Sequence, residues 1–76
     1  MGLEKVVLNK LEEVNADLAD NAYFCNGTLF IRNANQFNAV DMFRIMNAIK
    51  SVVTCDLDLN MSSDVVGQAE YAIDFM

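Results

Sequence analysis

The stretch AYFCNGTLFI, residues 22–31, decides the fold. Asn26 and Gly27 stand between two short runs of residues that favour β-strands. Asn-Gly is the strongest short-range signal for a two-residue hairpin turn, because a type I′ turn needs positive φ at both central positions. Such a turn pairs Cys25 with Thr28. One face of the hairpin then carries Ala22, Phe24, Leu29 and Ile31. The other face carries Tyr23, Cys25, Thr28, Phe30 and Arg32.

Helical periodicity precedes the hairpin. Apolar residues recur at spacings of four, four, three and four, and on a helix they form one narrow seam: Leu3, Val7, Leu11, Val14 and Leu18. Asp20 and Asn21 then offer a place for the helix to stop. The pattern predicts a single amphipathic helix from the start of the chain to this point.

A second helix is predicted after the hairpin, and its start is well marked. Asn38 is a favourable N-cap residue, and Asp41 three positions later completes a variant capping box. Phe37 and Met42 occupy the two positions of a hydrophobic staple. The apolar residues cover about half of the helix circumference: Ala39, Met42, Phe43, Ile45, Met46 and Ile49. Because so wide a face needs more than one neighbour, we expect this helix to lie at the centre of the core.

Two runs of strict alternation fill the last third of the chain. Apolar and polar residues alternate from Val53 to Met61 and again from Ala69 to Phe75, on either side of a turn over residues 62–67. Period-two patterning indicates a half-buried antiparallel hairpin. The elements read αββαββ, so we expect an α+β fold in which a four-stranded antiparallel sheet carries two helices on one face. Residues 1–76 are expected to form a single domain, because so few residues cannot build a second core.

The charge balance argues against direct nucleic-acid binding. Eleven acidic residues stand against five basic ones, the formal net charge is -6, and the basic residues are scattered: Lys5, Lys10, Arg32, Arg44 and Lys50. Binding to phosphates needs several cations that displace counterions together. The chain also shows no signal peptide and no apolar run of about 18 residues, so we expect a cytoplasmic protein that does not enter a membrane.

The sequence offers little for catalysis. It contains no histidine, and Cys25 and Cys55 lie far apart in no metal-binding spacing. A structural zinc site needs four Cys or His ligands, so such a site is excluded within one chain. No cation lies beside Cys25 in the sequence to activate it, and both thiols are expected to be small packing residues. We therefore expect no enzymatic activity and no cofactor.

One motif raises the alternative of a divalent-cation site. Asp56, Asp58 and Asn60 match the first, third and fifth ligand positions of an EF-hand loop. The same loop needs a glycine at its sixth position and a glutamate at its twelfth, where this chain has Met61 and Gly67. The leucines between the acidic residues suit a strand better than a calcium loop. The sequence thus favours an acidic, solvent-facing strand.

Two surfaces remain as candidates for binding. The first is an acidic partner-binding face on the C-terminal hairpin, formed by Asp56, Asp58, Glu70 and Asp74. Carboxylates this close together destabilise a sheet slightly, so they are either a solubilising surface or a row offered to a basic partner. The second is an apolar interface on the outer face of the Asn-Gly hairpin, formed by Tyr23, Phe30, Cys25 and Arg32. It is uncovered unless the N-terminal segment wraps over it.

These surfaces predict a small acidic domain that binds protein. The leading hypothesis is an inhibitor or adaptor, such as a phage-encoded antagonist, that engages a basic, nucleic-acid-binding protein through the acidic face. Homodimerisation is expected through the aromatic hairpin face or the first helix. A second hypothesis is a structural subunit whose apolar surface serves self-association alone. The divalent-cation-binding protein is the third.

Overall fold

The first hairpin forms in the register that its turn predicts. In a computed structural model that describes residues 2–76, strand β1 (Ala22–Cys25) pairs antiparallel with strand β2 (Thr28–Ile31), and Cys25 lies opposite Thr28. The turn residues Asn26 and Gly27 have φ values of 52° and 82°. Because both central positions are left-handed, the type I′ prediction is confirmed.

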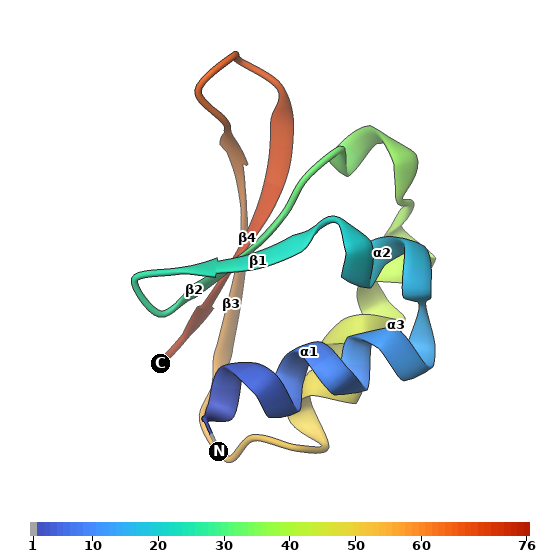
Figure 1. The fold of residues 1–76 in the computed structure, drawn as a ribbon, viewed down its shortest axis with the longest axis vertical. Coiled ribbons are helices and arrows are strands. Elements are labelled where there is room, and N and C mark those ends of the chain that lie inside the picture. Colours follow the sequence, from blue (N-terminus) through green and yellow to red (C-terminus); the bar gives the residue numbers. More distant parts are fainter. Residues whose placement is uncertain (1) are drawn as a thin grey trace.

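The remaining strands complete one antiparallel sheet. Helix α1 (Leu3–Val14) and the short helix α2 (Ala16–Asp20) precede β1, and the 3-10 turn η1 (Ala34–Gln36) leads from β2 into helix α3 (Ala39–Lys50). Strand β3 (Leu57–Ser63) and strand β4 (Ala69–Phe75) follow. The strand order is β1-β2-β4-β3, so β4 is an inner strand and β3 an outer one (Figure 1). The α+β fold with a four-stranded antiparallel sheet is therefore confirmed.

The core lies between the helices and the inner strands. Buried residues of the helices and of the sheet form a single cluster: Val7, Leu11, Leu18, Leu29, Ile31, Phe37, Met42, Ile45, Ile49 and Ile73. Leu29 pairs directly with Ile73, so these two side chains share one face of the sheet. The ribbon shows α1 and α3 together beside the sheet, with α3 behind α1 in this view (Figure 1).

The N-terminal helix is divided, where the sequence predicts one continuous helix. Asn15 has φ −156° and ψ 98°, which is extended backbone, and it separates α1 from α2. Its side-chain oxygen accepts a 3.1 Å hydrogen bond from the Leu18 N–H and so acts as N-cap of the second segment. The prediction is wrong at this residue because Asn competes for backbone hydrogen bonds. Leu18 is nevertheless buried in the core.

Helix α3 begins as predicted. The Asp41 N–H donates a 2.9 Å hydrogen bond to Asn38 Oδ1, and the Asn38 N–H donates a 3.2 Å bond to Asp41 Oδ2. This reciprocal pair is a capping box and satisfies two backbone donors at the helix start. Phe37 and Met42 are both buried. The cap fixes where α3 starts and hence which of its residues face the sheet.

Strand β3 begins later than the alternation predicts. The Val53 N–H donates a 3.1 Å hydrogen bond to the Ile49 carbonyl, so Val53 belongs to the turn that ends α3. Leu57 pairs with Phe75, and the Met76 N–H bonds to the Asp56 carbonyl, so pairing with β4 reaches no further back than Asp56. The predicted strand over residues 53–56 is therefore wrong. Val53 and Cys55 alternate in sequence, but their backbone has no strand to pair with.

Candidate functional site

Strand β3 leaves apolar side chains uncovered on the helix-facing side of the sheet. Leu59 pairs with Ile73 and Met61 pairs with Tyr71, so both side chains lie on the face that carries the core. Ile73 is fully buried, whereas Leu59 is 38% exposed and Met61 is 60% exposed. The inner strands are thus covered, and the outer strand is not.

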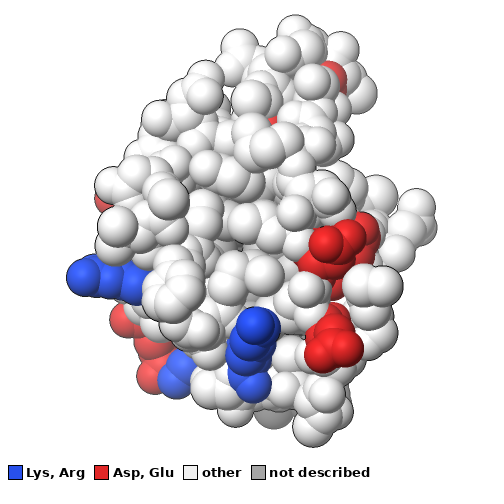
Figure 2. Space-filling view, turned by 180° about the vertical axis from the view of Figure 1, so that it is seen from behind, with Lys and Arg blue, Asp and Glu red and all other residues white. Residues whose placement is uncertain are grey.

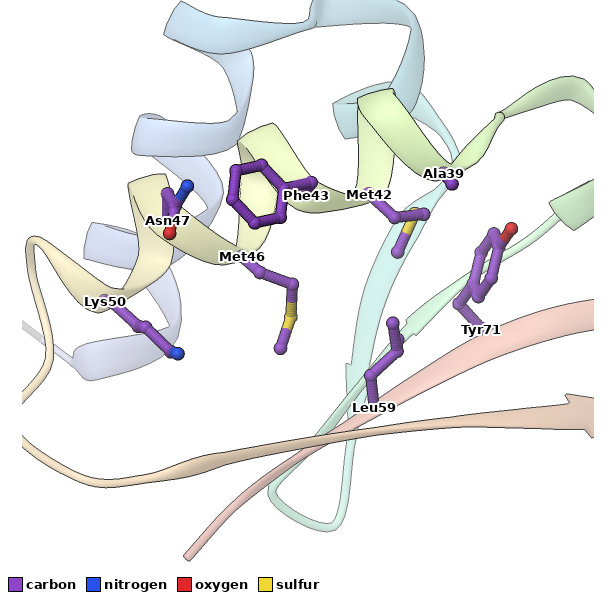
Figure 3. A pocket seen from close by; sticks show the side chains of 8 residues that line it. All are labelled: Ala39, Met42, Phe43, Met46, Asn47, Lys50, Leu59 and Tyr71. Atoms are coloured by element: carbon purple, nitrogen blue, oxygen red, sulfur yellow. The ribbon is translucent and has the colours of Figure 1, made fainter.

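A groove runs between α3 and this strand. Its volume is about 430 Å³, and it is lined by Ala39, Met42, Phe43, Met46, Asn47, Lys50, Leu59 and Tyr71. Met46 points from α3 toward the strands and Leu59 points back toward the helix, with Lys50 and Tyr71 at opposite ends (Figure 3). The Tyr71 hydroxyl donates a 3.3 Å hydrogen bond to the Phe37 carbonyl, which holds that ring at the groove end. We call this the α3–β3 groove.

The groove opens on a surface with little charge. Phe43 on α3 is 69% exposed. The view from behind, which presents the α3 side, shows a broad uncharged centre, and most of the charged side chains gather in the lower half (Figure 2). An exposed phenylalanine that shares a groove with an exposed leucine is typical of a protein contact surface.

Sequence reasoning missed this groove although it named its residues. The sequence places Phe43 and Met46 in the wide apolar arc of the second helix, and it places Leu59 and Met61 on the apolar side of the alternating run that ends at Met61. The assignment of Leu59 and Met61 to one face is correct, whereas the expected burial of Phe43 is wrong, because 69% of its surface is exposed. A single helix such as α3 is too narrow to cover β4 and the outer strand together. The available signal was the width of the apolar arc on α3.

The opposite face of the sheet carries an aromatic and charged cluster. Tyr23 and Phe30 stack at 5.3 Å between ring centroids, and the Arg32 guanidinium carbon lies 4.5 Å from the Tyr23 ring centroid. The Tyr23 hydroxyl donates a 3.1 Å hydrogen bond to Glu70 Oε2. Glu70 is buried, with 4% of its surface exposed. We call Tyr23, Phe30, Arg32 and Glu70 the tyrosine cluster.

The tyrosine cluster changes the acidity of its hydroxyl. Burial raises the pKa of Tyr23 above its ordinary value of 10.0, and the hydrogen bond to Glu70 and the charge of that carboxylate raise it further. The Arg32 guanidinium opposes this shift because it favours the phenolate. The proton therefore stays on Tyr23 and the hydroxyl acts as the donor.

The predicted apolar interface is brought together in part. Tyr23, Phe30 and Arg32 are in contact in the tyrosine cluster, and Tyr23 and Phe30 are half-buried. Cys25 lies at the exposed end of β1 beside the turn, opposite Thr28. The structure therefore brings Phe30 and Arg32 against the Tyr23 ring and leaves the Cys25 thiol at the tip of the hairpin.

The four predicted acidic residues do not form a continuous row. Asp58 and Asp74 lie directly opposite each other in the β3–β4 pair. The Thr28 hydroxyl donates a 2.7 Å hydrogen bond to Asp74, and the Asn60 amide donates a 3.0 Å bond to Asp58. Asp56 lies two residues before Asp58, and its carbonyl accepts a hydrogen bond from the Met76 N–H, whereas Glu70 lies four residues before Asp74 on β4.

Asp56 precedes β3, whereas Glu70 lies near the other end of β4 within the tyrosine cluster. Two of the four carboxylates, those of Asp58 and Asp74, therefore face each other. In residues 2–76, no group of three or more carboxylates or thiols is close enough to hold a metal ion. The same residues contain no helix long and apolar enough to cross a membrane.

No family model matches the chain, and comparisons with curated proteins and with solved structures found no significant match.

Proposed function

We propose that this chain is a non-enzymatic protein-binding domain whose principal contact surface is the α3–β3 groove. The observation that carries the proposal is the exposure of Phe43 and Leu59 in one groove, with the exposed Met61 next to it on β3 opposite the groove residue Tyr71, in a chain of net charge -6. A small acidic domain has ample polar residues for its surface. Two large apolar side chains left exposed in a hollow, with a third beside it, therefore favour burial against another protein.

The energetics of the groove support this function. Complete burial of a Phe, Leu or Met side chain contributes about 1.5–3 kcal/mol, and each of these three is partly exposed in the monomer. Flexible methionines adapt to the shape of a partner, and Met42 and Met46 line the groove floor. Lys50 at one end supplies a cation that can hydrogen-bond a carboxylate or carbonyl.

The test compares two exposed positions of the same helix. Phe43→Ser removes the aromatic ring at the groove, whereas Val40→Ser changes a residue that is 57% exposed on α3 and does not line it. Tagged wild type and both variants are used to capture proteins from a lysate, and captured chains, including untagged copies of this one, are identified by mass spectrometry. We expect capture to be lost with Phe43→Ser and kept with Val40→Ser. Equal capture by both variants would remove the groove from the function.

A second candidate function rests on the carboxylates of the opposite face. Asp58 and Asp74 face each other across two strands, an arrangement that costs stability and so favours a role in binding. On this proposal the domain acts as an inhibitor or adaptor, such as a phage-encoded antagonist, and engages a basic, nucleic-acid-binding protein. Capture of such a partner would fall as salt rises, because exposed charge pairs are screened. Capture that Asp58→Asn leaves unchanged would count against it.

A further inference from the structure

Strand β3 is the longer and less protected edge of the sheet, and its only charged residue is Asp58. It is seven residues long and contains no proline, no lysine and no arginine, and its pairing with β4 runs without a bulge. The other edge strand, β1, is four residues long. Sheets that stay monomeric usually shorten, charge or bulge their edges, because unpaired N–H and C=O groups invite another strand. The less protected edge is therefore the long one beside the α3–β3 groove.

The hydrogen bonds at both ends of β3 show which backbone groups face outward. The Asp64 N–H bonds to the Gln68 carbonyl, and the Met76 N–H bonds to the Asp56 carbonyl. Antiparallel partners alternate between hydrogen-bonded and non-hydrogen-bonded pairs, so the even-numbered residues of β3 direct their backbone groups toward β4. The odd-numbered residues then direct theirs outward: Leu57, Leu59, Met61 and Ser63.

We propose that two copies of this chain associate through antiparallel pairing of their β3 edges, about a two-fold axis at Asn60. The inference rests on the proposed function and names a second copy as the protein that covers the α3–β3 groove. Leu57 of each copy pairs with Ser63 of the other, and Leu59 pairs with Met61. These pairs use the outward backbone groups and extend the sheet continuously from one copy to the other.

The register follows from length and charge. An axis at Asn60, the middle of Leu57–Ser63, pairs every residue of the strand. It also places Asp58 opposite Ser62 of the second copy, so no two carboxylates meet. An axis at Asp58 would set the two Asp58 side chains against each other, which is destabilising. An axis at Leu59 or Met61 leaves part of the strand unpaired.

The pairing also covers the apolar surface. Leu59 of one copy lies beside Met61 of the other on the helix-facing side, where both are exposed in the monomer. A strand added next to β3 continues the groove floor beneath the edge of α3, on the side where Phe43 is exposed. One contact thus pairs the open backbone edge and covers the exposed Leu59 and Met61 of both copies.

The charge of the chain sets the salt dependence of this contact. Each copy carries a formal charge of -6, so association brings together two acidic domains. Salt screens the repulsion between exposed charges, and the dimer therefore becomes tighter as salt increases. This direction is opposite to that expected for a basic partner on the acidic face.

Disulfide trapping tests the register directly. In a background with Cys25→Ser and Cys55→Ser, Asn60→Cys places two thiols across the axis in a non-hydrogen-bonded pair, with Cα atoms about 4.5 Å apart, which a disulfide can span. The matched control is Asp58→Cys, on the same face of the same strand. In the proposed register, position 58 of one copy lies opposite position 62 of the other copy. Position 58 of that other copy is four residues further along its strand, so the two thiols lie about 13 Å apart. In a glutathione redox buffer we expect a covalent dimer with Asn60→Cys and none with Asp58→Cys. Equal cross-linking, or cross-linking of position 58 alone, would overturn the register.

Self-association without a disulfide is measured by gel filtration with light scattering. We expect wild type to become dimeric as its concentration rises, more readily at high salt. Met61→Lys places a charge at the proposed interface and should leave a monomer, whereas Val40→Lys, on α3 away from the edge, should leave the dimer. Circular dichroism confirms that both variants are folded.

The outcomes separate this inference from the function on which it rests. A wild type that stays monomeric at about 1 mM, well above the dissociation constant of a specific dimer, overturns the second copy as partner. If Phe43→Ser still loses a captured protein other than this chain, the protein-binding function stands with that protein as its partner. If neither a dimer nor a difference between Phe43→Ser and Val40→Ser is found, both proposals fail.

Discussion

The Tyr23 hydroxyl lies 3.1 Å from Oε2 of the buried Glu70, and this hydrogen bond joins β1 to β4 across the intervening strand β2. A buried carboxylate is costly unless it is hydrogen-bonded. In residues 2–76, no buried side-chain nitrogen or oxygen lacks a hydrogen-bond partner. The tyrosine is therefore what allows Glu70 to be buried on this face, and the pair ties the edge strand of the sheet to an inner one.

The loss of the tyrosine hydroxyl is expected to destabilise the fold. Tyr23→Phe should lower the free energy of unfolding by about 1–3 kcal/mol, because it leaves a buried carboxylate without its donor. Tyr71→Phe is the matched control, since its hydroxyl bonds to a neutral backbone carbonyl at 3.3 Å, and about 0.5–1.5 kcal/mol is expected. Urea denaturation at neutral pH measures both. A larger loss for Tyr71→Phe would contradict the role assigned to the Tyr23–Glu70 pair.

The raised pKa of Tyr23 makes stability depend on alkaline pH. Above pH 10.0 the unfolded chain loses the tyrosine proton while the folded chain retains it, so the folded state binds more protons. Stability that is fully present below pH 10.0 is therefore lost as pH rises through the folded-state pKa. The difference in unfolding free energy between wild type and Tyr23→Phe should be constant from about pH 7 to about pH 9.5 and shrink above it. A constant difference across the alkaline range would show that the pKa is not raised.

The capping box of α3 gives a third prediction. Asn38→Ala removes the acceptor of the Asp41 N–H at 2.9 Å and should lower the free energy of unfolding by about 0.5–2 kcal/mol. Asn35→Ala, in η1, changes another exposed asparagine outside the cap and serves as the control. Thermal and urea unfolding measure the two variants. Equal effects would show that the cap does not hold the start of the helix.

Local signals in the sequence predicted the parts of the fold that local chemistry controls. The Asn26-Gly27 turn needs only two left-handed residues, and the Asn38 cap needs only its own helix, so both were predicted correctly. Tertiary pairing controls the start of β3, which was predicted wrongly. Val53 continues the alternation, but no residue of β4 lies opposite it. The break at Asn15 was also missed although it is local, because the apolar periodicity continues through Asn15 and masks the cap that its side chain forms for α2.

The sites follow the same division. The faces of the tyrosine and acidic residues could be assigned from period two alone, and the Asp58–Asp74 pair lies as the alternation implies. The burial of Glu70 could not be predicted from the alternation, because it depends on Tyr23 two strands away. The wide apolar arc on α3 was a signal for an uncovered face, but the position of the α3–β3 groove also depends on the strand order that makes β3 an outer strand.

The facing carboxylates of β3 and β4 give the last prediction. Asp58 and Asp74 are direct cross-strand partners, so their charges repel, and the Asn60 amide and Thr28 hydroxyl offset this only in part. Asp58→Asn removes one charge and keeps an oxygen that can accept the Asn60 hydrogen bond. It should raise the free energy of unfolding by about 0.2–1 kcal/mol, and more at low salt than at high salt because screening weakens the repulsion in wild type. Asp56→Asn is the control, because Asp56 precedes the strand and has no carboxylate opposite it in the β3–β4 register. Urea denaturation at two salt concentrations distinguishes the variants. An equal gain from both would show that stability responds to net charge and not to the pairing of these two residues.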